Sequence, residues 1–434
     1  MTNRKLLLNA FLPSAGIDDP HRFAGRKEEV EELTDALLVK NSVPLIYGPR
    51  GLGKSSLALQ LSRIAQGDVD LLSELDLEDL ALEEDDRFIV VYLTCTDETK
   101  NAQGVIRMMI NGLSVFQDQK ESERNPDKYK LIDKTTKRRI SLKLFSSETT
   151  KTYNAQAKKI STSKFTPEEK LVHLVELVYD VYKQPVLFIV DEFDRLGSTK
   201  GFASFLKSQS SEYLKVALVG IGATEGTLLR DHKSLDRQLM PVRVPKMARL
   251  ELESIFDRTE DYLLENGIEY GFSAEAARLA ARTASGFPWF MHVLGQTALL
   301  EVEKHGRAGV GEHDIRDAIA SLPKRRLAKQ YNDRYLLAVR DSYYREVVLR
   351  LCAGWMEEDI PTSEIYRRAN KVGVNSPSQY MGHLTRTEHG QVITRSLQQS
   401  RVYAFTDEVF KAYVRMRPST YEGVKDEVDR VLRE

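Results

Sequence analysis

One stretch decides the fold, and it reads Val43-Pro44-Leu45-Ile46-Tyr47-Gly48-Pro49-Arg50-Gly51-Leu52-Gly53-Lys54-Ser55-Ser56-Leu57-Ala58-Leu59-Gln60-Leu61. An apolar run, a glycine-rich turn and a helix that begins at the lysine form the sequence context of a phosphate-binding loop. Glycines let the backbone approach a ligand closely, and the loop N–H groups together with the positive end of the helix attract phosphates. The pattern therefore predicts a strand, a nucleotide-binding turn and a helix.

The turn residues have distinct expected roles. Lys54 should reach the terminal phosphates and contribute to catalysis, while Ser55 should coordinate Mg2+. Arg50 is expected to face solvent or an interface rather than a phosphate. The nucleotide-binding residues expected in this stretch are Gly48, Pro49, Arg50, Gly51, Leu52, Gly53, Lys54, Ser55 and Ser56.

Composition sets the outer limits. With 434 residues, 41% of them hydrophobic, the chain can bury more than one core, and two or three domains are expected. A net charge of -1 means that any nucleic-acid binding must be local. The two cysteines, Cys95 and Cys352, match no metal-ligand or redox spacing and are expected to be buried. The N-terminal apolar run is too short for a signal peptide and no stretch is long enough to span a membrane, so we expect a soluble cytoplasmic protein.

A second motif ends a second apolar run. Residues 186–190 read Val-Leu-Phe-Ile-Val and are followed by Asp191 and Glu192. Carboxylates at the carboxyl end of a buried parallel strand lie where such sheets bind ligands. We expect Asp191 to hold Mg2+ and Glu192 to orient the attacking water as a catalytic residue. The alternative is an ordinary acidic turn after a strand.

Two further segments resemble a known family. Phe23-Ala24-Gly25-Arg26-Lys27-Glu28-Glu29, some twenty residues before the glycine-rich turn, resembles the adenine-flanking box of AAA+ ATPases and of the related STAND ATPases. This resemblance implies that Phe23, Gly25 and Arg26 lie beside the nucleotide. Gly286-Phe287-Pro288 resembles the STAND form of the helical lid, which implies that Pro288 packs near the adenine. Initiator ATPases carry a sensor-2 arginine here, whereas this chain has Trp289.

The same resemblance implies two more catalytic residues. Thr224 follows the apolar run 215–221 and corresponds to sensor 1, although Ala223 takes that place in another register and Thr224 can simply cap a turn. Arg237 corresponds to the arginine finger that a neighbouring subunit supplies, with Arg243 as second choice. Either arginine can equally be a surface residue.

The expected fold is α/β: a P-loop NTPase with an AAA+-like five-stranded parallel sheet, a helical lid and a C-terminal winged-helix domain. The expected ATPase core is 1–246, the lid 247–322, and the winged helix with its tail 323–434. Helices at 343–352, 363–370 and 376–387 and extended runs at 391–394 and 401–405 predict the winged helix, with 321–335 as a linker. Residues 68–86, with ten acidic and no basic residues, should be a solvated surface segment.

Residues 119–164 hold thirteen Lys or Arg against five Asp or Glu and interrupt the core. They predict either a basic arm for nucleic acid or a partner, or a solvated insertion.

Two functions from different classes remain open. The first is a Mg2+-dependent ATPase of the AAA+/STAND type that acts as a regulatory switch through protein partners and forms a homo-oligomer in the ATP state. The second is a DNA-binding AAA+ ATPase similar to replication initiators or transposition regulators, with duplex DNA as partner. A scaffold without turnover is disfavoured by Glu192. No membrane partner is expected.

Overall fold

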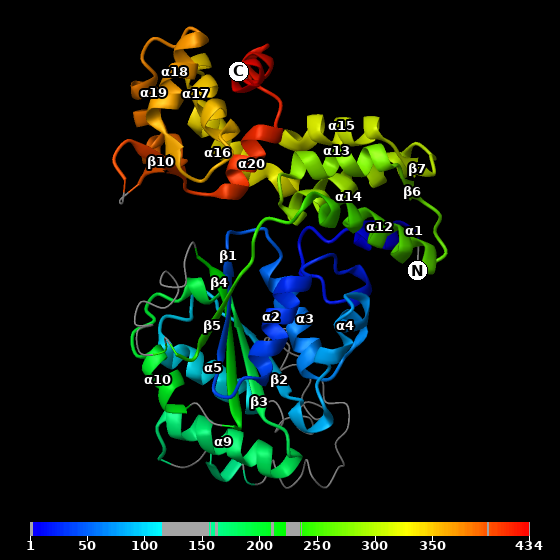
Figure 1. Ribbon diagram of the computed structural model, residues 1–434, viewed down its shortest axis with the longest axis vertical. Helices are drawn as coiled ribbons and strands as arrows, with labels where there is room; N and C mark the ends of the chain where they lie inside the picture. Colours follow the sequence, from blue (N-terminus) through cyan, green and yellow to red (C-terminus); the bar gives the residue numbers. More distant parts are fainter. Residues whose placement is uncertain are drawn as a thin grey trace, which may run out of the picture. The chain divides into compact units, whose positions relative to one another are not determined.

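The computed structural model describes residues 3–114, 156, 158–160, 164–209, 212–222, 235, 237–396 and 399–433. The chain divides into two compact units (Figure 1). We call Gly16–Gly48 with Gly53–Pro245 the sheet unit, and Met1–Ala15 with Pro49–Leu52 and Lys246–Glu434 the helical unit. The boundaries of the core, lid and winged helix at residues 246 and 322 remain a prediction.

The sheet unit is built on five parallel strands in the order β2-β3-β4-β1-β5. Four of them are almost wholly buried, which is typical of parallel strands covered by helices on both faces. The predicted five-stranded parallel sheet is thereby confirmed. The strands are β1 Val43–Gly48, β2 Ile89–Thr94, β3 Val186–Asp191, β4 Leu214–Ile221 and β5 Leu239–Arg243.

Helices cover the two faces of this sheet. Alternate strand residues such as Val91, Phe188 and Leu218 form one core with α5, α9 and α10. The other face is covered by α2 and α3. The predicted start of α9 is confirmed, because Thr166 and Glu169 form a capping box. The bounds are α2 Lys27–Leu38, α3 Lys54–Ala65, α4 Asp70–Glu74, α5 Ala102–Ser114, α9 Pro167–Tyr182 and α10 Phe202–Gln209.

The helical unit contains the predicted lid. The lid helices are α12 Arg249–Glu265, α13 Ala274–Ala284, α14 Pro288–Lys304 and α15 Glu312–Ser321, and two short strands, β6 Gly271–Phe272 and β7 Gly309–Val310, pair beside them. The N-terminal helix α1, Asn3–Ala10, packs on α12 and α14. The Phe11 ring lies 5.4 Å from that of Phe256, which makes the N-terminus part of the lid core.

The C-terminal part is a winged helix, as predicted. Three helices, α17 Tyr343–Gly354, α18 Thr362–Lys371 and α19 Pro377–Leu384, are combined with an antiparallel sheet in the order β8-β10-β9, and β8 lies between α17 and α18 in the chain. The sheet strands are β8 Ile360–Pro361, β9 Ile393–Arg395 and β10 Val402–Phe405. The closing helices are α20 Glu408–Met416 and α21 Val424–Arg433.

One prediction for this region was wrong. Residues 321–335, expected as a linker, instead contain two 3-10 turns and most of the helix α16 Lys329–Val339. Tyr331, Tyr335 and Ala338 of that helix are buried, so its apolar side packs into the core. Among the described residues, no helix is both long and apolar enough to cross a membrane.

Candidate functional site

The glycine-rich turn leaves β1 in a conformation that favours glycine. Gly48, Gly51 and Gly53 all have positive φ, at 149°, 76° and 90°. A Cβ atom on Gly48 would lie 2.8 Å from the carbonyl oxygen of Val244, closer than such atoms approach. The backbone between β1 and α3 therefore favours glycine at these positions, and a side chain at Gly48 would clash.

Helix α3 begins where the sequence predicts. Gly53 caps it in the left-handed region, and Lys54 is its first residue. The Lys54 side chain is buried, whereas Ser55 is exposed. Since the first N–H groups of a helix have no partner within it, this end of α3 has the geometry and the polarity to attract an anion.

Hydrogen bonds connect the carboxyl ends of three strands in the sheet unit. The Gly222 N–H donates to the carbonyl of Gly48 at 3.4 Å, which joins the ends of β4 and β1. The Ile221 N–H donates to Asp194 Oδ1 at 2.8 Å, which joins the end of β4 to the turn after β3. Gly48 and the acidic end of β3 therefore lie at one edge of the sheet, with the end of β4 between them.

Asp191 is the last residue of β3 and is 7% exposed. The Tyr92 hydroxyl on the neighbouring strand β2 donates to its Oδ2 at 2.7 Å. The backbone N–H of Glu192 donates to its Oδ1 at 2.7 Å. Both carboxylate oxygens are thus held in place by the sheet unit itself.

Negative charge accumulates at this edge. Cys95 follows β2, and its N–H donates to the carbonyl of Asp191 at 2.8 Å. Burial, reinforced by the charges of Asp191, Asp194 and Glu192, raises the pKa of the Cys95 thiol to about 12. The thiol is therefore neutral at physiological pH, in agreement with the expected buried cysteine.

The residues present fit a magnesium ion with bound phosphate. Mg2+ prefers oxygen ligands and is usually held by one or two carboxylates together with phosphates and water. Asp191 offers carboxylate oxygens and Ser55 a hydroxyl. The described residues contain no group of three His, Cys, Asp or Glu that could hold a metal alone, and such a site does not require one.

Glu192 adopts a left-handed conformation, with φ 53°, directly after β3. Its carboxylate accepts from Nε of Arg195 at 2.8 Å. Arg195 also lies 3.6 Å from Asp97 Oδ1. In this structure the predicted catalytic carboxylate is therefore paired with an arginine three residues further along the chain.

The box that resembles the adenine-flanking segment is ordered within the sheet unit. Gly25 and Arg26 are consecutive left-handed residues, and Arg26 is the N-cap of α2. Phe23 is buried. The guanidinium of Arg26 donates to Glu29 Oε1 at 2.8 Å, so the structure gives Arg26 an internal partner. Its contact with nucleotide remains a prediction.

Pro288 lies in the helical unit as the first residue of α14, where proline fits well. The indole N–H of the next residue, Trp289, donates to the carbonyl of Pro13 at 2.9 Å. Gly51 belongs to the same unit, and a Cβ there would lie 3.2 Å from Val409 Cγ2 and 3.7 Å from the Trp289 Cβ. Substitution at Gly51 would thus meet α20 and α14 in addition to its unfavourable φ.

The remaining predicted residues lie at β5 or outside the described residues. Arg237 lies just before β5 and Arg243 ends it, and both are exposed. Thr224 and Ala223 lie outside the described residues, as does most of the basic insertion 119–164.

Sequence reasoning missed two side chains that hold the carboxylates. Tyr92 lies inside an apolar run, and only the pairing of Thr94 with Asp191 places it beside that carboxylate. The pairing of Arg195 with Glu192 had a weak signal in the sequence, because an acid and an arginine three residues apart commonly pair in a helical turn.

Comparisons with known proteins find structural likeness only. No protein-family model and no curated protein matches the chain. The ORC2 protein of Aeropyrum pernix, solved in ADPNP-ADP complexes, is 15% identical, with a TM-score of 0.45 over 94% of this chain and 93% of that one. Cdc6p from Pyrobaculum aerophilum is 12% identical, with a TM-score of 0.44 over 98% and 97% of the two chains. The RuvB Holliday junction branch migration motor of Thermotoga maritima is 14% identical, with a TM-score of 0.41 over 89% and 94%.

The elements of this chain themselves define its fold. The glycine-rich turn follows β1, the paired acids follow β3, and both strands lie in one parallel sheet of five. A helical lid and a winged helix complete the chain. This chain therefore has the P-loop α/β fold of the AAA+ type, with a helical lid and a C-terminal winged helix.

Proposed function

We propose that this protein binds and hydrolyses ATP with Mg2+ and uses the nucleotide state as a regulatory switch for conformation and assembly. One observation carries the proposal. The glycine turn that opens α3 and the acidic end of β3 lie at one edge of the sheet, connected through the end of β4. Parallel sheets bind ligands at this edge, and phosphoryl transfer depends mainly on positioning and electrostatics.

Each residue then has a role in the proposed reaction. The N–H groups at the start of α3 hold phosphate oxygens, and Lys54 offsets the charge of the terminal phosphates. Asp191 and Ser55 would hold Mg2+, which when bound neutralises charge on the phosphates. Glu192 orients the attacking water once its carboxylate leaves Arg195. Phe23, Gly25, Arg26 and Pro288 are proposed adenine neighbours, and Arg237 is a proposed finger from a second subunit.

The switch requires different affinities of the two nucleotides for two conformations, since a ligand with equal affinity shifts no equilibrium. The STAND-like Gly-x-Pro segment and the near-neutral net charge of -1 favour this regulatory use. The proposed domains are the core 1–246, the lid 247–322 and the winged helix 323–434.

The test compares ATP turnover and ATP binding in wild type and three variants. Glu192→Gln should lower kcat by about 100-fold or more while leaving ATP affinity close to wild type, because the water loses its base but the phosphate contacts remain. Lys54→Ala should weaken ATP binding itself. Glu31→Gln, an exposed acid on α2, is the matched control and should change neither quantity. Equal turnover by wild type and Glu192→Gln would contradict the role of Glu192.

DNA binding is the second candidate, because a winged helix and a basic insertion are both present. The described winged helix gives it limited support, since Arg367 and Arg368 of α18 both pair with Glu364, at 2.6 and 3.0 Å. Binding of Glu192→Gln to duplex DNA, measured with ATP and with ADP at two salt concentrations, separates the candidates. ATP-dependent binding that weakens steeply with salt would favour DNA handling.

A further inference from the structure

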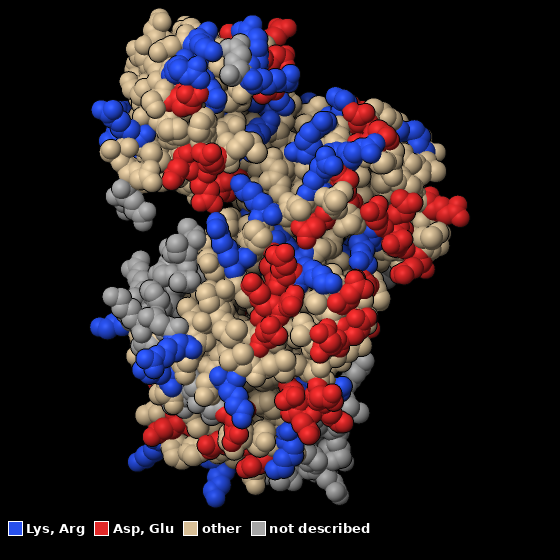
Figure 2. All heavy atoms as spheres, in the orientation of Figure 1, with Lys and Arg blue, Asp and Glu red and all other residues tan. Residues whose placement is uncertain are grey.

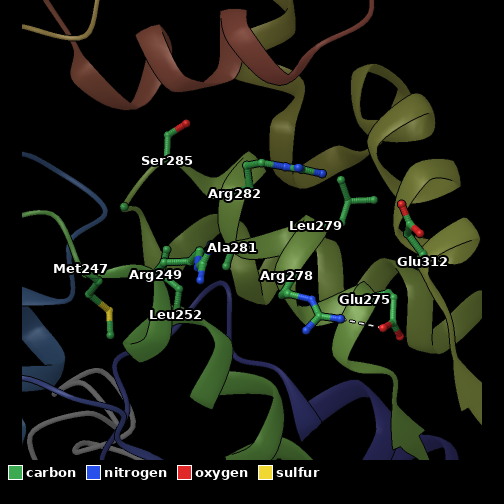
Figure 3. Close-up of a pocket in the computed structure, with 11 residues that line it drawn as sticks. Met247, Arg249, Leu252, Glu275, Arg278, Leu279, Ala281, Arg282, Ser285 and Glu312 are labelled. Carbon is green, nitrogen blue, oxygen red and sulfur yellow. Dashed lines mark hydrogen bonds and ion pairs between the residues drawn. The ribbon is translucent and has the colours of Figure 1, made fainter.

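A pocket of about 420 Å³ lies entirely within the lid of the helical unit (Figure 3). The start of α12, the outer side of α13 and the start of α15 surround it. Its apolar lining comes from Met247, Leu252, Leu279 and Ala281, and its charged lining from three arginines, Arg249, Arg278 and Arg282, and two glutamates, Glu275 and Glu312. None of these residues belongs to the proposed nucleotide site.

The arginines of this pocket are able to bind an incoming carboxylate, either in place of their present ion-pair partner or in addition to it. Arg278 pairs with Glu275 at 2.6 Å and Arg249 with Glu253 at 3.2 Å, each on its own helix. The Arg278–Glu275 pair is exposed on both sides and contributes little to stability, so exchanging it for an incoming carboxylate costs little. Among the described residues, Arg249 and Arg278 form ion pairs and Arg282 forms none. A guanidinium can bind a carboxylate through two parallel hydrogen bonds. Figure 2 shows basic side chains gathered over α13 and α15.

The same chain carries a surface of opposite charge on its sheet unit. We call residues 78–86 the acidic segment. Its six acids are exposed, and they are Glu78, Asp79, Glu83, Glu84, Asp85 and Asp86. Leu80 and Ala81 between them are partly exposed. Figure 2 shows acidic side chains on the side of the sheet unit where α4 lies.

We propose that the lid pocket of one copy receives the acidic segment of a second copy. Charge complementarity selects this occupant, because the acids face the arginines while Leu80 and Ala81 match the apolar lining. The overall charge of -1 conceals this division into two complementary surfaces. A contact between two different surfaces leaves one pocket and one acidic segment available for a further copy. The proposal goes beyond the nucleotide switch, since it names the surfaces that associate and does not depend on hydrolysis.

The test is a charge exchange, followed by sedimentation velocity of the full chain with and without Mg2+ and ATP. Wild type should associate, and high salt should weaken the association. The pair Arg278→Glu with Arg282→Glu should weaken it at least about tenfold, and so should the pair Glu84→Arg with Asp85→Arg, because each places like charges together. A chain carrying all four changes should associate again, since the opposite charges meet once more.

Matched controls reverse two charges elsewhere on each unit. Arg4→Glu with Lys304→Glu in the helical unit, and Glu28→Arg with Glu31→Arg in the sheet unit, should associate like wild type. Far-UV circular dichroism establishes that each variant is folded. A monomeric wild type with and without nucleotide would overturn the proposal, as would a folded four-change variant that stays monomeric. An absence of ATP turnover in a wild type that still associates would count against the proposed ATPase and not against this contact.

Discussion

Asp191 shows how much of the candidate site depends on single side chains. The sequence identifies this carboxylate from its place after an apolar run, and the structure adds the groups that hold it. Tyr92 donates to one of its oxygens and the Glu192 N–H to the other. A buried carboxylate with both oxygens engaged is oriented before any cation arrives, which lowers the cost of ordering it on binding.

Tyr92→Phe tests this orientation. Removing the hydroxyl frees one oxygen of Asp191, so turnover should need several-fold more Mg2+ for half-maximal rate, in line with the loss of one hydrogen bond of about 1 kcal/mol. ATP binding measured without Mg2+ should stay unchanged. Tyr179→Phe, in which the altered ring lies on α9 beside Tyr213, is the control. An unchanged Mg2+ requirement would show that the Tyr92 hydroxyl does not position Asp191.

Residue types and spacing predicted the phosphate turn and the paired acids because those motifs are contiguous in sequence. Tyr92 and Asp191 are 99 positions apart, and only strand pairing brings them together. Their contact therefore has no local signal.

At the scale of elements, β4 and α2 are joined by a buried lysine. Lys215 on β4 donates through Nζ to the carbonyls of Ala36, Leu37 and Val39 at 3.0, 2.7 and 2.7 Å. It also lies 2.9 Å from Ser42 Oγ. These carbonyls lie in the last turn of α2 and at its C-cap, Val39, where the last C=O groups of a helix have no partner within it. Burial lowers the pKa of Lys215 to about 8, so the ammonium form still dominates at neutral pH.

Lys215→Met should lower the free energy of unfolding by about 2–4 kcal/mol, because several buried carbonyls lose their donor while the side-chain volume is nearly kept. Urea unfolding followed by far-UV circular dichroism measures the change. Lys207→Met, at an exposed position of α10, is the matched control and should stay within about 0.5 kcal/mol of wild type. A similar midpoint for both variants would mean that the end of α2 does not depend on Lys215.

Helices and strands could be predicted where apolar residues follow a clear local pattern. They could not be predicted where tertiary contacts determine the secondary structure. The strands β1, β3 and β4 are largely apolar runs, and the sequence predicts each of them. The helix α16 lies in a stretch rich in Lys and Arg that resembles a linker. Its helical state depends on Tyr331 and Tyr335, which are buried against the winged helix, where the Tyr335 ring lies 4.0 Å from the Arg417 guanidinium.

At the scale of the whole molecule, the order of the strands could not be predicted from the sequence, because parallel pairing leaves no local signal in it.

Acid stability is also a property of the whole molecule, since it sums over titrating groups in both units. In the helical unit, His383 and His389 stack with ring centroids 5.3 Å apart. Nδ1 of His383 lies 3.4 Å from an Arg345 guanidinium nitrogen. Burial first, and then the charge of Arg345, lowers the pKa of both imidazoles. Arg340 and Arg386 act in the same direction, and Glu388 opposes them.

These shifts predict that the folded protein loses stability in acid. A histidine whose folded pKa lies below its unfolded value binds protons preferentially when unfolded, so its contribution is complete above about pH 6.5 and falls as the pH decreases. His21 acts in the opposite sense, because its hydrogen bond to Glu74 raises its pKa, but its side chain is 60% exposed. The two lowered groups should therefore decide the direction.

The measurement is the free energy of unfolding from urea titrations between pH 5 and pH 8. Wild type should be less stable at the acid end, and the variant His383→Gln with His389→Gln should show a clearly shallower dependence, since glutamine cannot titrate. His173→Gln, at an exposed position of α9, should keep the wild-type slope. Equal slopes for wild type and the double variant would assign the acid sensitivity to other groups and would mean that the stacked pair binds protons equally in the folded and the unfolded chain.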